Sequence, residues 1–284
     1  MDVTSQVIDA INGWLQSLTH AVLQPALQAA GQLLFQTPQF DQIDAIQKGW
    51  EVTRGVTDAL LVLAVLIGGV MIMASGTFET NYTAKRLLPR LVLAAVLGNS
   101  SLALCGALIK LDNALVAGLL GTEPGQTLWA QLTAGLGQSE PGGQVLSSLL
   151  GLVAALLAVL LVVVYIVRDL VLLVATVLAP LALAAYCLPQ TEELAELWGR
   201  IYAAGLLVQV LQAILIAVGA QLAAHTNWLG AGSALVGGLV LITLLYLLLK
   251  LPFLAYRWAF RQPVRQNRLA QAVVVAARAV AAAS

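Results

Sequence analysis

The chain has 284 residues, of which 60% are hydrophobic and only 10% carry a charge. Soluble domains carry about 25% charged residues, so this composition excludes an ordinary soluble domain and indicates a membrane protein. Lysine and arginine together number 14, as do aspartate and glutamate, so the bulk charge predicts no polyanionic partner.

The first predicted element is an amphipathic helix over residues 3–35. Apolar side chains recur three and four residues apart along one stripe, at Val7, Ile11, Leu15, Leu18 and Val22. Pro25 is expected to interrupt the helix. A row of glutamines spaced by four lies along one face of this part of the helix, at Gln24, Gln28 and Gln32. Helices that lie in a membrane interface usually carry lysine and arginine. The glutamines therefore favour packing against protein over an interfacial position.

A polar connection leads to two apolar segments, 56–75 and 87–109, each long enough to cross a hydrocarbon layer of about 30 Å. The short loop expected between them holds Lys85, Arg86 and Arg90. Asn99 lies near the middle of the second segment with Ser100 and Ser101. Hydrogen bonding to a neighbouring helix is the simpler interpretation of Asn99, and lining a water-filled path is the alternative.

Residues 110–144 are expected to form an exposed loop that faces a partner, because long irregular loops in compact proteins are often functional. Residues 145–188 form an almost continuous apolar run. A straight helix of this length reaches about 66 Å, twice the hydrocarbon thickness, so the run must either fold back or project from the membrane. The expected fold-back point is Arg168 and Asp169. The simpler interpretation of this pair is a cytoplasmic turn. The alternative is a buried charge that ties helices together or faces a conduit.

Two further apolar segments cover 201–224 and 233–256. Gln209 and Gln212 share one face of the first, which favours interhelical packing over pore lining. A basic tail follows, with one stripe at spacings of four, four and three: Arg257, Arg261, Arg265 and Arg268. Anchoring to anionic lipid is the simpler function of this stripe, and guiding nucleic acid or docking a cytoplasmic ATPase is the alternative.

The charge pattern predicts the topology. Basic residues near span ends stay in the cytoplasm, so the arginine tail is expected inside, and residues 1–47, which have no lysine or arginine, are expected outside. This orientation needs an odd number of crossings, whereas six segments are long enough. We predict five crossings, with the segment 201–224 as the weakest candidate.

Two prolines mark the end of the long run. Pro180 is expected to bend a buried helix, and Pro189 to stop it before a new helix that starts near Thr191. The block from 165 to 215 combines "APLALAAY", "LP" and Trp198 in that order. This block resembles the TrbL-type inner-membrane proteins of conjugation and type IV secretion machines. The resemblance implies a polytopic secretion-channel subunit, assembled as a ring in the bacterial inner membrane.

The sequence thus predicts an all-α polytopic membrane protein with five or six transmembrane helices and an amphipathic N-terminal helix. We divide it into an N-terminal helical region (1–55), a transmembrane domain (56–256) with the exposed loop 110–144, and a basic cytoplasmic tail (257–284). The expected function is a channel or scaffold subunit whose partners are lipids, other copies, secretion subunits including an ATPase, and translocated DNA or protein.

The sequence also allows two other functions. One is a membrane anchor for another machine, such as a contractile injection apparatus, and the other, which is less favoured, is a small-molecule transporter. No catalytic triad, phosphate-binding loop or metal-ligand spacing occurs in the sequence, so neither an enzyme nor a cofactor is expected.

Overall fold

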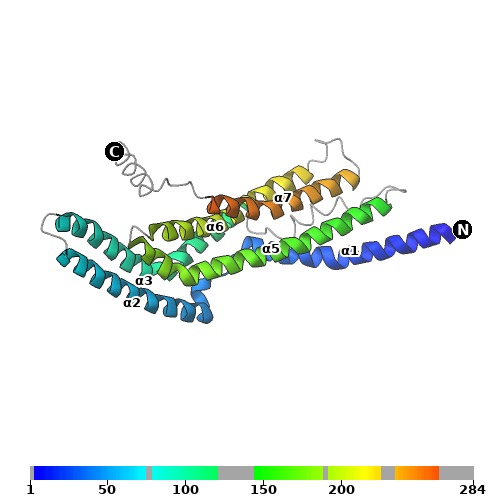
Figure 1. Cartoon of the computed structure of the whole chain (residues 1–284). Coiled ribbons are helices and arrows are strands. Elements are labelled where there is room, and N and C mark those ends of the chain that lie inside the picture. Colours follow the sequence, from blue (N-terminus) through cyan, green and yellow to red (C-terminus); the bar gives the residue numbers. More distant parts are fainter. Residues whose placement is uncertain (1–2, 75–78, 121–143, 188–190, 225–233, 262–284) are drawn as a thin grey trace, which may run out of the picture.

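The computed structural model describes residues 3–74, 79–120, 144–187, 191–224 and 234–261 (Figure 1). Within these ranges the chain is helical and has no strand, which confirms the all-α polytopic fold. The elements are α1 (Val3–Phe35), η1 (Phe40–Gln42), α2 (Asp44–Ala74), α3 (Glu79–Leu120), α5 (Gln144–Ala184), η2 (Ala185–Cys187), α6 (Glu192–Ala224) and α7 (Ala234–Phe260).

Helix α5 is the central element, and all the other α-helices pack against it. It is one continuous helix of 41 residues that passes through both Arg168 and Pro180. The expected fold-back at Arg168 is therefore wrong. No glycine or proline lies at that point to end the helix, and apart from Asp169 the neighbours of Arg168 are as apolar as the rest of the run.

Helices α1 and α2 lie one after the other along α5. Gly151 of α5 meets Thr19 of α1, whereas Gly49 of α2 meets Val177, so α1 covers the first part of α5 and α2 the second. Both run in the same direction as α5, and residues 36–43, which include η1, connect them. Together α1 and α2 form one discontinuous helical path beside α5 (Figure 1).

Helix α3 is longer at both ends than the sequence pattern indicated. It starts at Glu79 and continues to Leu120, so residues 79–90 of the first expected loop and residues 110–120 of the expected exposed loop are helical. Residues 121–143, which make up the rest of the expected exposed loop, lie outside the described residues. Helices α6 and α7 form an antiparallel pair, in which Gly219 lies against Leu244. The close approach at Gly219 depends on the absence of a side chain there.

The interior divides into apolar clusters along α5. The largest one joins α1, the first part of α5, the second part of α6 and α7, with Leu27, Leu161 and Leu245 almost fully buried. The second joins η1, α2, α3, the last part of α5 and the first part of α6, around Phe40 and Ile109. The two clusters meet at the level of Arg168.

The outer surface is apolar as well. Leu156 and Val163 on α5 and Phe253 and Trp258 on α7 are each at least half exposed, as expected for side chains that face lipid. Four helices in the described ranges are long and apolar enough to cross a membrane, within α3, α5, α6 and α7. They include the segment 201–224, which the sequence ranked as the weakest. The expected segment 56–75 ends partly outside the described residues, so the number of crossings stays a prediction.

Helix α1 has three distinct faces. Its buried face contains Leu23, Leu27 and Leu34 and packs on α5, while Val7 and Ile11 of the predicted apolar stripe are half exposed. The glutamine row lies on a third, exposed face. The helix continues through Pro25, which corrects the expected interruption.

Candidate functional site

A polar network surrounds Arg168, whose side chain is only 1% exposed. The Arg168 Nε donates a hydrogen bond to the carbonyl oxygen of Gly205 at 2.8 Å. Its Nη2 donates to the Gln209 Oε1 at 2.6 Å and to the Thr37 Oγ1 at 3.1 Å. One guanidinium group thereby joins α5 to α6 and to the segment between α1 and α2.

Two acidic side chains lie beside Arg168. The Asp169 Oδ1 accepts a hydrogen bond from Arg168 Nη1 at 3.1 Å, and the Asp112 Oδ2 on α3 lies 3.6 Å from Nη2. The Asp112 side chain is 5% exposed and that of Asp169 is 13% exposed. Buried charges are tolerated when they are paired and hydrogen-bonded, and Arg168 meets both conditions.

Asn113 holds the break between α1 and α2. Its Oδ1 accepts a hydrogen bond from the backbone N–H of Thr37, and its Nδ2 donates one to the Thr37 carbonyl, both at 2.9 Å. The Gln209 Nε2 also donates to the Asn113 Oδ1 at 3.2 Å, and the Thr37 hydroxyl donates to the Gln209 Oε1. The backbone N–H and C=O of Thr37 are thus both satisfied by one side chain, as non-helical backbone inside a membrane protein requires.

We call this network the clamp. It connects α3, α5, α6 and the α1–α2 junction at the level where the two large apolar clusters meet. Its members are Arg168, Asp169, Asp112, Asn113, Gln209 and Thr37. Because the donors of Arg168 point to groups of the same chain and almost none of its surface is exposed, Arg168 fits a structural tie better than a conduit wall. A cytoplasmic turn at Arg168 is excluded, since the residue lies within α5.

The other predicted polar residues lie away from this network. Gln212 is buried, and its Nε2 donates to the Leu248 carbonyl of α7 at 2.9 Å. Asn99 is exposed on α3, where its Nδ2 donates to the Ala95 carbonyl and to the Asp58 Oδ1 of α2, at 3.0 and 3.3 Å. The contacts to Leu248 and Asp58 join neighbouring helices, whereas the contact to Ala95 lies within α3. Neither residue joins the network around Arg168.

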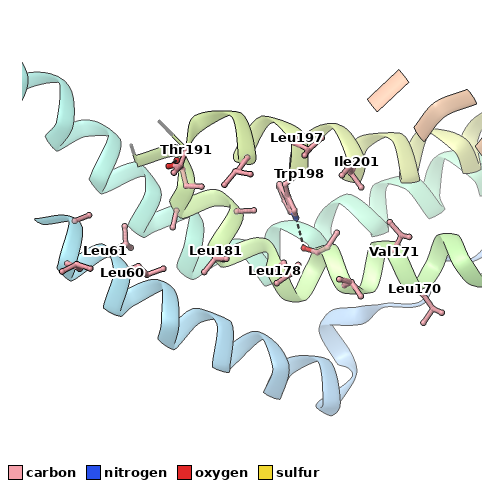
Figure 2. Close-up of a pocket in the computed structure, with 18 of the residues that line it drawn as sticks. Leu60, Leu61, Leu170, Val171, Leu178, Leu181, Thr191, Leu197, Trp198 and Ile201 are labelled. Atoms are coloured by element: carbon pink, nitrogen blue, oxygen red, sulfur yellow. Dashed lines mark hydrogen bonds between the residues drawn. The ribbon is translucent and has the colours of Figure 1, made fainter. Parts of the chain in front are cut away.

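Pro180 lies in the last part of α5, whereas Trp198 lies in the first part of α6. Pro180 cannot donate its helical hydrogen bond, and two carbonyls in the turn before it accept side-chain hydrogen bonds from neighbouring helices. Trp198 Nε1 donates to the Ala175 carbonyl at 2.8 Å (Figure 2), and Thr53 donates to the Val177 carbonyl at 2.6 Å. Trp198 therefore fixes α6 on the proline-containing turn of α5. Pro189 lies outside the described residues.

Half of the predicted basic stripe is described. Arg257 lies in the last turn of α7 and Arg261 directly after the helix, and both are exposed. Arg265 and Arg268 lie outside the described residues. The exposure of the first two is compatible with contact to a lipid headgroup or to a partner.

Sequence reasoning missed three residues of the network, namely Thr37, Asp112 and Asn113. Asp112 and Asn113 fall within the expected loop 110–144, although an adjacent acid and amide within "LIKLDNALVAGLL" give a usable signal. Polar groups inside an apolar stretch need partners. Thr37 gives no such signal, because it lies in a polar connection.

Within the described residues there is no group of three or more histidine, cysteine, aspartate or glutamate side chains that could hold a metal ion. The model of one protein family, described as TrbL/VirB6 plasmid conjugal transfer like protein, matches residues 1–284. No curated protein and no solved structure matches the chain.

Proposed function

The chain belongs to the family of TrbL/VirB6 plasmid conjugal transfer-like proteins, and from this premise we propose that it is an oligomeric scaffold and channel subunit in the bacterial inner membrane. Family membership implies a subunit of a conjugal transfer or type IV secretion machine. The expected partners are other secretion subunits, including a cytoplasmic ATPase, and the cargo is DNA or protein. The match over the whole chain is the observation that carries this proposal.

The clamp around Arg168 supports a route between protomers rather than through one. Arg168 and Gln209 are buried and hydrogen-bonded within the chain, so they do not offer a polar wall to a substrate. The apolar clusters on either side of them are close-packed as well. In the proposed ring, each protomer is a rigid wall element.

The glutamine row of α1 is the polar surface best suited to border such a route. Gln24, Gln28 and Gln32 are all exposed, on a face distinct from the one that packs on α5. Hydrocarbon offers no hydrogen-bond partner to an amide. The row therefore favours a position against water, a substrate or a neighbouring protomer over one against lipid.

The proposed topology places the N-terminus in the exoplasm and the C-terminus in the cytoplasm. The arrangement of the helices supports it, because α1 and α2 run in series along α5 and count as one traverse. Helices α3, α5, α6 and α7 add four more, which gives the odd number that the charge pattern requires.

The test uses single cysteines in a background in which Cys105 and Cys187, the two native cysteines, are replaced by serine. Gln28→Cys is compared with Val22→Cys, which lies on the exposed apolar stripe of the same helix. Membrane-impermeant thiol reagents are expected to block transfer only in the Gln28→Cys strain. Equal effects at both positions would count against a route along the glutamine row.

The purified assembly separates the proposal from its rivals. A ring with a central opening agrees with a channel, and a closed or lipid-filled assembly agrees with a membrane anchor for another large apparatus. A monomer or dimer agrees with a small-molecule transporter. Transporters usually show matching broken helices in both halves, whereas the break at residues 36–43 occurs in the first half only, within the described residues.

A further inference from the structure

An apolar groove of about 880 Å³ runs along the last part of α5 (Figure 2). Helix α2 forms one side and α6 the other, and Ala175 on α5 lies at its floor with 7% exposure. Of the 19 lining residues, all but Thr191 and Trp198 are leucine, valine, isoleucine or alanine. The volume is within the range of about 300–1,000 Å³ that is typical of ligand sites.

The groove offers no free hydrogen-bonding side chain along its length. The Trp198 Nε1 donates to the Ala175 carbonyl, and the Thr191 hydroxyl donates to the Ala185 carbonyl at 2.6 Å. Water in the groove would therefore lack partners, because an ordered water needs two to four of them. The natural occupant is apolar.

The shape of the walls favours an acyl chain over a helix from a second copy. Helices in membranes associate closely through small or polar residues, whereas the walls here carry branched side chains such as Leu60, Leu63 and Leu197. From Val167 to Ala185 the floor extends over about 27 Å at the rise of an α-helix. This length is close to the hydrocarbon thickness of about 30 Å, so an acyl chain can lie along it.

A cation stands beside one end of the groove. Arg90 Nη1 lies 3.2 Å from the Glu192 Oε2, and its guanidinium lies over the Tyr186 ring at 5.5 Å. Glu192 and Tyr186 directly neighbour in sequence the lining residues Thr191 and Ala185. The Arg90 side chain is 34% exposed, so it has donors available for an anionic headgroup.

We propose that this groove binds a phospholipid, with one acyl chain lying in the groove and the phosphate of the headgroup at Arg90. The exposed Arg90 guanidinium therefore favours an anionic headgroup, as basic side chains at membrane surfaces do. The proposal does not depend on whether the assembly is a channel, because it concerns the contact of one protomer with lipid.

The test compares two pairs of variants. Leu178→Trp fills the groove, and its control is Leu156→Trp, another exposed leucine of α5 that lies outside the lining. Arg90→Gln removes the headgroup contact, and its control is Arg54→Gln, which changes an exposed arginine of α2 outside the lining. Each protein is purified in detergent, delipidated, and titrated with phosphatidylglycerol or phosphatidylcholine. Native mass spectrometry counts the bound lipid, and circular dichroism confirms the fold.

The wild-type protein and both controls are expected to bind one phosphatidylglycerol molecule more tightly than any further lipid molecules. Displacing about two methylene groups weakens binding about tenfold, so Leu178→Trp should reduce the affinity by at least that factor. Arg90→Gln should keep lipid binding and lose the preference for phosphatidylglycerol. Equal binding by Leu178→Trp and Leu156→Trp would overturn the proposal. So would a disulfide between two copies through Leu178→Cys, because a neighbouring helix would then fill the groove.

Discussion

Replacing Arg168 by leucine is the sharpest test of the clamp. The substitution removes the donors to Gly205, Gln209 and Thr37 and leaves the buried Asp112 carboxylate without its cation. Removing one partner of a buried ion pair costs about 3–5 kcal/mol. Domain stabilities are about 5–15 kcal/mol, so Arg168→Leu should remove a large share of the free energy of unfolding.

The double variant Arg168→Leu with Asp112→Leu separates the lost contacts from the stranded charge. In the double variant the Asp112 charge is no longer buried without a partner, and only Asp169, which is 13% exposed, still loses its cation. The double variant should therefore recover at least about 2 kcal/mol relative to Arg168→Leu. Lysine at position 168 keeps the charge but not the planar fork of donors, and an intermediate loss is expected.

Reversible unfolding in mixed detergent and dodecyl sulfate micelles measures these differences, and the six tryptophans of the chain provide the fluorescence signal. The reasoning is refuted if Arg168→Leu loses less than about 1 kcal/mol, the level of a single ordinary hydrogen bond. It is also refuted if the double variant is as unstable as Arg168→Leu. If transfer activity is lost in a double variant that has regained stability, Arg168 has a role beyond structure.

Three further predictions concern other parts of the fold. Asn113→Leu leaves the Thr37 backbone groups unpaired and should lower the free energy of unfolding by about 1–3 kcal/mol in the same assay. Gly205→Ala should destabilise the protein by about 1–3 kcal/mol, because a Cβ there would lie 2.7 Å from a methyl carbon of the fully buried Leu172. Its control is Gly55→Ala, where no atom lies within contact of the new methyl group, and which should stabilise the protein by up to about 1 kcal/mol. The double variant Arg257→Gln with Arg261→Gln should stay in membranes that are washed with carbonate. Transfer activity should persist in this variant if the stripe contacts lipid alone, and should fall if the stripe contacts a partner.

The helical, membrane-embedded character of the chain could be predicted because composition and segment length determine it directly. The extent of α3 and α5 could not. Charged residues at positions such as Arg168 and Asp112 resemble loop signals in a single sequence, since most of their partners lie at least 37 residues away. Once those partners are in contact, the charges belong inside helices.

The apolar stripe of α1 shows the same difficulty in reverse. Its period was identified correctly, but Val7 and Ile11 point outward, and the buried face is Leu23, Leu27 and Leu34 with the small residue Ala30. In water the most apolar face of a helix is buried. In a membrane protein both faces can be apolar, so periodicity predicts a helix without telling which side meets protein.

The position of the clamp follows from the break between α1 and α2. A helix that ends inside the bundle leaves N–H and C=O groups unpaired, and neither lipid nor apolar side chains can satisfy them. Asn113 pairs with both backbone groups of Thr37, and Gln209 and Arg168 bind the Thr37 hydroxyl. A buried cation is otherwise costly, but Arg168 binds the Thr37 hydroxyl and Gln209, and Gln209 in turn donates to the Asn113 oxygen that accepts from the Thr37 backbone N–H. The charge and the discontinuity in the α1–α2 path are therefore parts of one polar network, joined through Thr37 and Gln209.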